Sequence, residues 1–324
     1  MTIGPSGGTA APGIPGSPGG PARPSVTELE QLAREARGHL VDMIHRANAG
    51  HMGGPLSAMD LLVALYFAVL RINPADPQWK DRDRFILSKG HSGVALYAVL
   101  AMRGYFPIEE LATFDTGDSR LQSHPDMHLA PGIDASTGSL AQGFSEALGI
   151  AMGLRRRGNP AHVFVMLGDG ELQEGQAWEA VHVAPRYGVG NLTAILDWNG
   201  MQQYGWRLGE GEEHRGDRRD PWAGVNLRGA FEAFGWRVLE IDGHDMAQVT
   251  AACDDARAAG ANGGTRPTVI LARTQKGRGI SFTEGRSAWH ARAPQAAEAQ
   301  AAHEELAAQG AGTPGPAGAG EGAR

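Results

Sequence analysis

Two apolar segments lead directly to polar side chains that could hold a metal ion. The segment VFVMLGDGELQEGQ, residues 163–176, runs from five apolar residues into Asp169, and NLTAILDW, residues 191–198, ends just before Asn199. If both segments are neighbouring parallel strands, their carboxyl ends meet at one edge of a sheet, where ligands of α/β proteins bind. A carboxylate, an amide oxygen and a nearby backbone carbonyl suit Mg²⁺, which keeps water and phosphate oxygens as its other ligands. The sequence therefore predicts a metal-bound diphosphate at this edge.

The glycines on either side of Asp169 support this hypothesis. Gly168 and Gly170 let the backbone approach a ligand closely, and the amides that begin the next predicted helix add partial positive charge. A Gly-Asp-Gly sequence alone most often forms a tight turn, so the hypothesis depends on its pairing with Asn199.

Four histidines in predicted loops strengthen the case for a functional site. They lie in the segments AGHMGG, KGHSG, QSHPD and SAWHA, as His51, His91, His124 and His290. A single loop histidine is more often hydrogen-bonded than a ligand, but four of them together are less easily explained in that way.

These residues require a framework that brings distant loops together. Apolar segments rich in Val, Ile and Leu alternate with helical segments, and this is typical of a parallel sheet covered on both faces, a doubly wound α/β fold. A Ser57 to Asp60 capping box is expected to begin one buried helix. The expected strands are a short one at the start of RFILSKGHS (84–92) and others at 162–167, 191–198, 236–242 and 267–274. The expected helices lie at 26–47, 92–103, 139–158, 172–187, 225–234 and 245–259.

Composition narrows the function classes and the setting. The 324-residue chain has a net charge of -7, which argues against nucleic-acid binding. The apolar segment 58–70 is too short for a bilayer of about 30 Å, so no membrane span is expected. Cys253 is the single cysteine, which excludes an intrachain disulfide and favours a cytoplasmic protein. We expect Gly/Pro-rich disordered tails at 1–25 and 309–324 around one domain, 26–308.

Several segments, in this order, resemble the amino-terminal, diphosphate-binding module of transketolases. The resemblance spans about residues 30–295 and is strongest to split transketolases, in which this module is a separate subunit. The segments that carry it are NAGHMGGPLSAMDLLVALYF, FILSKGHSGVALYAVLAMRGY, STGSLAQGFSEALGIAMG, LGDGELQEGQAWEA, LDWNGMQ, FGWRVLEIDGHD and KGRGISFTEGRSAWH.

The resemblance implies a site for thiamine diphosphate and Mg²⁺. The metal ligands it implies are Asp169, Asn199 and the carbonyl oxygen of Met201. The residues it implies around the cofactor are His91, Gly138, Ser139, Leu140, Gly170, Asn199 and His290.

The resemblance also implies transfer of a two-carbon ketol unit from a ketose to an aldose, either of which can be a sugar phosphate. His51, His124 and His290 resemble residues that face the sugar hydroxyls and assist proton transfer at the C3 hydroxyl of the donor, and Glu174 matches a carboxylate of an interface proton network. The thiazolium of the cofactor serves as the electron sink, and histidines are suited to the accompanying proton transfers.

The second half of the family's site has no counterpart in this sequence. Neither the pyrimidine-binding module, with its glutamate and stacking aromatic residue, nor the basic residues that hold a sugar phosphate are found. The resemblance thus implies that the partner is a separate carboxyl-terminal transketolase subunit, in an α2β2 assembly, without which the chain is inactive.

Three departures from the family pattern concern loops. Met52 follows His51 where the family commonly has proline, which predicts a less rigid loop. Pro125 and Asp126 follow His124 where the family tends to have glutamate. The charged segment 205–226 is longer than usual and is either a solvated surface loop or a specificity element.

Three other functions remain open. The chain could be the α subunit of a 2-oxo acid dehydrogenase or part of a deoxyxylulose phosphate synthase, both of which share the Gly-Asp-Gly to Asn signature. The histidines favour a sugar-handling enzyme over these two. The third alternative is a non-catalytic binding or scaffold homologue, which would have no need of the metal and histidine residues.

Overall fold

The framework of the protein is a single five-stranded sheet in which every strand is parallel to its neighbours. A computed structural model describes residues 15, 20–203, 221–222, 224–261 and 263–310. The strand order is β1-β2-β3-β5-β4, and the bounds are β1 (Arg84–Leu87), β2 (Val163–Gly168), β3 (Leu192–Trp198), β4 (Arg237–Asp242) and β5 (Thr268–Arg273). The predicted doubly wound α/β fold is confirmed.

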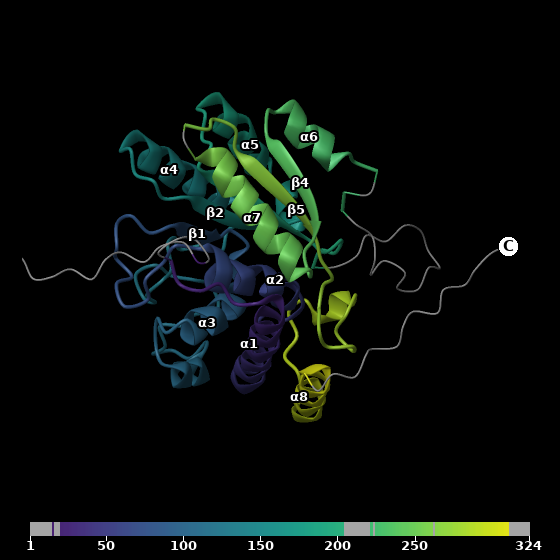
Figure 1. Cartoon of the computed structure of the whole chain (residues 1–324). Helices are drawn as coiled ribbons and strands as arrows, with labels where there is room; N and C mark the ends of the chain where they lie inside the picture. Colours follow the sequence, from purple (N-terminus) through teal and green to yellow (C-terminus); the bar gives the residue numbers. More distant parts are fainter. Residues whose placement is uncertain (1–14, 16–19, 204–220, 223, 262, 311–324) are drawn as a thin grey trace, which may run out of the picture.

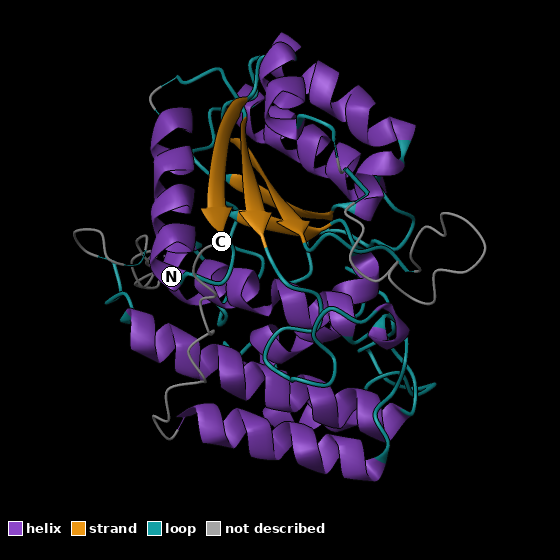
Figure 2. Cartoon of the chain, turned by 90° about the vertical axis from the view of Figure 1, so that its right-hand side faces the viewer, coloured by secondary structure: helices purple, strands orange, loops and turns teal. Residues whose placement is uncertain are grey.

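Helices cover both faces of the sheet (Figures 1 and 2). Alternate residues of β2 point to opposite faces, as the strand period of two requires: Val163 and Val165 pack in one core, Phe164 and Met166 in the other. The first core contains α4 (Gln142–Arg156), α5 (Gly175–Arg186) and α6 (Leu227–Ala233), and the second contains α2 (Gly53–Ala64) and α7 (Met246–Gly260).

An outer helical layer is built on α2. α1 (Val26–Ala47) and α3 (Gly93–Met102) pack against α2, and α8 (Ala296–Gly310) packs against α1. The π-helical segment η1 (Leu65–Val69) continues α2. Every residue of α2 is buried, as its nearly all-apolar sequence predicts. Short 3₁₀ segments lie at η2 (Gly90–Ser92), η3 (Ile108–Thr113), η4 (Gly170–Gln173) and η6 (Ser287–Trp289). Among the described residues, no helix is long and apolar enough to span a bilayer.

The start of α2 differs from its prediction. The helix begins at Gly53, so the predicted capping box of Ser57 and Asp60 is wrong. The Ser57 hydroxyl donates a hydrogen bond of 2.6 Å to Asp197 Oδ2 on β3, and Asp60 accepts hydrogen bonds from the guanidinium of Arg37. Both side chains therefore make tertiary contacts instead of capping a helix.

The remaining elements lie close to their predicted ranges. The helix predicted at 172–187 begins as an α-helix at Gly175, because η4 occupies the turn directly after Asp169. Helix α8 continues to Gly310, two residues beyond the predicted domain limit of 308. Most of both predicted tails, and most of the charged segment 205–226, lie outside the described residues.

Candidate active site

Asp169 lies where the ends of β2 and β3 meet. The two strands are paired in parallel, with Gly168 opposite Asp197, so the loops that follow them are neighbours, as predicted. The Asp169 side chain is 2% exposed. Its Oδ1 accepts from the amide of Gly170 at 2.8 Å and its Oδ2 from the amide of Gly200 at 2.6 Å. The carboxylate thus binds the loop after β3 through backbone contacts.

Asn199 and Met201 lie in that same loop. Asn199 Oδ1 accepts from the Met201 amide at 3.1 Å, and its Nδ2 lies 3.4 Å from the Ser57 hydroxyl. Within the described ranges, no group of three or more His, Cys, Asp or Glu is arranged to hold a metal. The predicted metal ligands are of another kind: one carboxylate, that of Asp169, with the Asn199 amide oxygen and the Met201 carbonyl oxygen.

Asp169 is a buried carboxylate without a cationic side chain bound to it in the described part of the chain. Its pKa is raised to about 7, chiefly by burial and also by the nearby charge of Asp197, against the opposing effect of the backbone hydrogen bonds and Lys276. The indole of Trp222 donates 2.7 Å to the Asp169 carbonyl oxygen. A hard divalent cation fits this position, since carboxylate, amide and carbonyl oxygens are its preferred ligands.

Asp197, at the adjoining position on β3, is fully satisfied. Its carboxylate forms an ion pair with Lys89 and accepts hydrogen bonds from the Ser57 and Thr274 hydroxyls. Burial raises the pKa of Asp197, but the charge and hydrogen bond of Lys89 and the two hydroxyls outweigh that effect and lower it overall. No sequence pattern singles out Lys89 or Asp197, because their pairing spans 108 residues.

The four predicted histidines form one cluster. The ring of His51 lies 5.1 Å from His91, 5.2 Å from His290 and 6.3 Å from His124, centroid to centroid, and His91 lies 5.5 Å from His290. His124 is exposed, whereas the other three rings are partly buried. Four loops that are distant in sequence therefore meet at one point.

Close backbone contacts hold these loops together. The Met52 amide donates 3.1 Å to the His290 carbonyl, a bond that proline could not make, so the loop is tied where reduced rigidity was predicted. A Cβ on Gly90 would lie 2.6 Å from the Thr137 carbonyl carbon, and one on Gly138 would lie 3.1 Å from the His124 ring. Glycine at position 90 is therefore needed for the approach of the two loops.

The environment keeps three of the imidazoles neutral. Burial lowers the pKa of His290 to about 3, with Lys276 and His51 contributing. Burial also lowers the pKa of His51, aided by His124 and Lys276, and lowers that of His91 well below its ordinary value, aided by Lys89. Neutral imidazoles can accept protons as well as donate hydrogen bonds.

Lys276 joins the histidine cluster to the loop after β3. Its Nζ lies 2.9 Å from His290 Nδ1 and donates 3.0 Å to the Gln202 carbonyl. Burial lowers the pKa of Lys276 to about 8, against the opposing charge of Asp169. Lys276 was not predicted as a site residue, although its position in the segment KGRGISFTEGRSAWH, which also contains His290, was an available signal.

Buried Glu171 connects the Asp169 turn to the turn that contains Gly138, Ser139 and Leu140. Its carboxylate accepts from the Ser88 hydroxyl at 2.5 Å and from the amides of Ala141 and Gly168 at 2.7 and 3.0 Å. Glu171 was not predicted as a site residue either. Its contacts tie the 138–141 turn to the turn that contains Asp169.

Gly170 and Glu174 complete the predicted set. A Cβ on Gly170 would meet the Gln202 side chain at 3.3 Å, so Gly170 faces the loop after β3. Glu174 is exposed at the start of α5 and, within the described chain, makes no hydrogen bond, ion pair or ring contact with the four histidines. Lys276 therefore links the histidines to the loop after β3, which is bound to Asp169, whereas Glu174 lies at the surface.

The chain matches a known protein family over most of its length. Residues 29–312 match the family model for the transketolase, thiamine diphosphate binding domain. The chain is 42% identical over 250 residues to the 6-deoxy-6-sulfo-D-fructose transketolase subunit of a Clostridium species, covering 77% of this chain and 86% of that protein. It is 38% identical over 278 residues to an apulose-4-phosphate transketolase subunit of Actinobacillus succinogenes, covering 86% and 95%.

Longer relatives and solved structures match over a shorter part of their length. Transketolase 1 of Vibrio vulnificus is 35% identical over 289 residues, which are 86% of this chain and 41% of that protein. A crystal structure of a Pichia stipitis transketolase variant superposes with a TM-score of 0.74 at 28% identity, covering 87% of this chain and 41% of that one. The chain thus spans less than half the length of these two proteins. It belongs to the transketolase family of enzymes and corresponds to an amino-terminal, thiamine diphosphate-binding transketolase subunit.

Proposed function

We propose that this chain binds thiamine diphosphate with Mg²⁺ and transfers a two-carbon ketol unit from a ketose to an aldose, together with a second subunit. The observation that carries the proposal is the meeting of two features at one sheet edge. One is a buried carboxylate to which, among the described residues, no cationic side chain is bound; the other is a cluster of neutral histidines linked to it by Lys276. When bound, the cofactor supplies the electron sink for cleaving the carbon bond.

The diphosphate end of the site is assigned to the loops after β2 and β3. In the proposal, Asp169, Asn199 and the Met201 carbonyl hold the cation, and Gly170 lets the backbone approach the diphosphate. Two observations support this assignment: the Lys276 ammonium contacts the loop after β3, and Glu171 fixes the neighbouring 138–141 turn. The proposed cofactor contacts include His91, Gly138, Ser139, Leu140 and His290.

The sugar end of the site is assigned to the histidine cluster. His51, His124 and His290 are proposed to orient the sugar hydroxyls and to take up or return the proton of the donor's C3 hydroxyl. The ring of His51 lies 6.3 Å from that of His124 and 5.2 Å from that of His290, and these distances, with the lowered pKa values of His51 and His290, support that role. Glu174 is proposed to act in proton exchange across a subunit interface, which is consistent with its exposure.

A partner subunit is proposed to complete the site, in an α2β2 assembly. Two relatives, of whose length this chain covers 86% and 95%, are named as subunits of transketolases. Beside the exposed His124, Met127 and Leu129 are 48% and 44% exposed, which suits coverage by another chain. We further propose that the assembly works in the cytoplasm, consistent with the single, buried Cys253.

The donor sugar is proposed to be a ketose or ketose phosphate. Two relatives are named for 6-deoxy-6-sulfo-D-fructose and for apulose-4-phosphate, which supports a sugar or sugar phosphate as the donor here.

The test of the proposed function is reconstitution. The chain is mixed with a candidate pyrimidine-binding subunit, thiamine diphosphate and Mg²⁺, and then incubated either with a ketose and an aldose or with pyruvate and an acceptor. Ketol transfer by the pair alone supports the proposal. Reaction with pyruvate would favour the 2-oxo acid or deoxyxylulose phosphate alternatives, ketol transfer by the single chain would refute the split site, and failure to bind the cofactor with any partner would favour a scaffold.

A further inference from the structure

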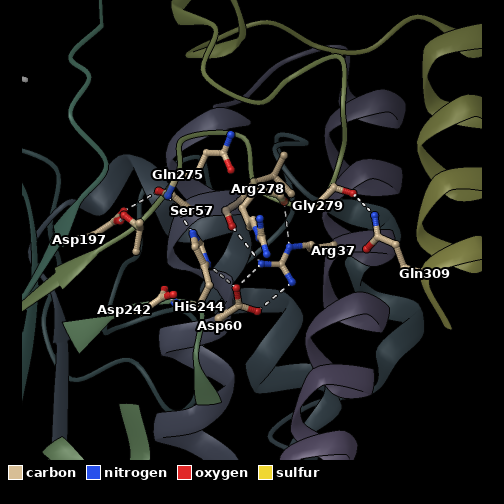
Figure 3. Close-up of polar contacts among 12 residues, drawn as sticks. Arg37, Ser57, Asp60, Asp197, Asp242, His244, Gln275, Arg278, Gly279 and Gln309 are labelled. Carbon is tan, nitrogen blue, oxygen red and sulfur yellow. Dashed lines mark hydrogen bonds and ion pairs between the residues drawn. The ribbon is translucent and has the colours of Figure 1, made fainter. Parts of the chain in front are cut away.

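The sequence FGWRVLEIDGHD contains a histidine that the proposed reaction does not use. His244 follows β4 and lies among buried polar side chains contributed by α1 and α2 (Figure 3). Asp60 on α2 accepts from Arg37 Nη1 at 3.0 Å and Nη2 at 2.7 Å, and from His244 Nδ1 at 2.7 Å. On the other side of the ring, His244 Nε2 accepts from the backbone amide of Gln275 at 2.8 Å.

These contacts fix the ring of His244 in one form. Nε2 faces an N–H donor, so it must present its lone pair, and the proton must therefore reside on Nδ1, where Asp60 accepts it. The bidentate Arg37 already neutralises the charge of Asp60, which is 6% exposed. A third donor is not needed to balance the charge, so the role of His244 lies at its other nitrogen.

The Gln275 amide, which donates its hydrogen bond to His244, belongs to a loop whose following residues are also held by hydrogen bonds. Arg37 Nε donates 3.0 Å to the Arg278 carbonyl, and Gln309 on α8 donates 2.9 Å to the Gly279 carbonyl (Figure 3). The Gly277 amide donates 2.9 Å to the Gly53 carbonyl at the start of α2. Gly277 has a φ of 79°, and a Cβ there would lie 2.3 Å from the Thr283 carbonyl oxygen, so this conformation requires glycine.

The side chain that this loop delivers to the site is Lys276. It lies between the held positions 275 and 277, and its Nζ reaches His290 Nδ1 and the Gln202 carbonyl. A shift of the Gln275 amide would move the adjacent Lys276 away from both partners. A displacement of about 1 Å at a site is enough to impair a reaction strongly.

We propose that His244 is a positioning residue. The Arg37–Asp60 ion pair holds its ring in place, the ring accepts a hydrogen bond from the Gln275 amide, and this contact keeps Lys276 beside His290. Its effect on the reaction rests on the proposed function, whereas its hold on the loop does not. No contact of His244 with substrate or cofactor is required.

Two substitutions separate the two ends of the ring. His244→Asn places an amide near the Nδ1 position and keeps a donor for Asp60 while losing the acceptor for Gln275. His244→Gln places an amide oxygen near the Nε2 position and keeps that acceptor. The control is His303→Asn, which removes another histidine paired to a carboxylate, Asp42 at 2.7 Å, on the exposed face of α8.

The first readout needs no cofactor. Nitrogen-15 NMR of histidine-labelled full-length chain is expected to show His244 as the Nδ1–H form, and hydrogen exchange at the Gln275 amide is expected to be slow. Exchange should accelerate at least tenfold in His244→Asn and remain within about threefold of wild type in His244→Gln and His303→Asn. The Nε2–H form, or unchanged exchange in His244→Asn, would overturn the proposal.

The second readout is the affinity for thiamine diphosphate with Mg²⁺ in the reconstituted pair, measured by calorimetry. His244→Asn is expected to weaken it about tenfold at an unchanged urea midpoint, and His244→Gln is expected to restore most of it. If both variants bind like wild type while exchange at Gln275 responds as expected, His244 holds the loop without serving the site, and the positioning role is wrong. If wild type itself does not bind, the proposed function fails, and the NMR result still decides the hold on the loop.

Discussion

Two buried aspartates at the ends of adjacent strands have opposite electrostatic situations. Asp197, at the end of β3, is surrounded by Lys89 and two hydroxyls, and its pKa is lowered overall. Asp169, directly after β2, has backbone amides as its hydrogen-bond partners, and burial raises its pKa to about 7. The same side chain at similar depth thus has its charge balanced by a lysine at one strand end, whereas at the other the described residues bind it through backbone amides.

The difference follows from what each carboxylate must do. A buried carboxylate that only supports the fold needs its charge balanced within the protein. A carboxylate that is to bind a cation is best left without a competing side chain, and this raises the energy of its charged form until the cation arrives. In this account, Asp197 supports the fold around the site, and Asp169 is the proposed ligand of the cation.

The largest expected effect comes from Asp197→Asn. The variant leaves Lys89 buried without its ion pair, which typically costs about 3–5 kcal/mol of unfolding free energy. Urea unfolding at pH 8 measures this loss. A loss below about 1 kcal/mol would show that Asp197 does not balance the buried charge of Lys89.

Asp169→Asn is expected to have the opposite effect in the absence of cation. The folded pKa lies above the unfolded value, so the folding free energy that Asp169 contributes is present at low pH and is lost as pH rises through about 7. The Asn variant also loses one of the two acceptors for the Gly170 and Gly200 amides, a cost that does not depend on pH. With EDTA, the stability of the variant relative to wild type should therefore rise by up to about 4 kcal/mol from pH 4 to pH 8. A stability difference that stays constant between these pH values would contradict the assignment.

Ser57→Ala should produce a smaller loss that sharpens the comparison. The variant removes one of the donors to Asp197 but keeps Lys89, so the expected loss is about 1 kcal/mol. Urea unfolding of this variant alone and combined with Asp197→Asn tests the coupling of the two residues. Fully additive effects would mean that the hydroxyl does not act through the carboxylate.

The positions of the strands, and of the site residues that follow them directly, could be predicted from the sequence. Apolar segments located the strands, and the rule for parallel crossovers placed Asp169 beside the loop of Asn199. Four loop histidines were recognised by type and by family resemblance, and their rings do form one cluster.

The supporting residues were not predictable, because their partners are distant in sequence. His244 and Asp60 are 184 residues apart, and Lys276 and the Gln202 carbonyl are 74 apart. Ser57 shows how a local pattern misleads: its spacing from Asp60 satisfies a capping box, but its hydroxyl bonds Asp197, 140 residues away. Only tertiary packing decides between such local and distant partners.

The most direct test of the central claim is the Mg²⁺ dependence of thiamine diphosphate binding by the reconstituted pair. Calorimetry with wild type should show binding that requires Mg²⁺, and Asp169→Ala should lose at least about 100-fold in affinity, a difference of about 2.7 kcal/mol. The control His303→Asn, which changes an exposed ion pair on α8, should bind within a few-fold of wild type. Equal affinity of wild type and Asp169→Ala in the presence of Mg²⁺ would contradict the account.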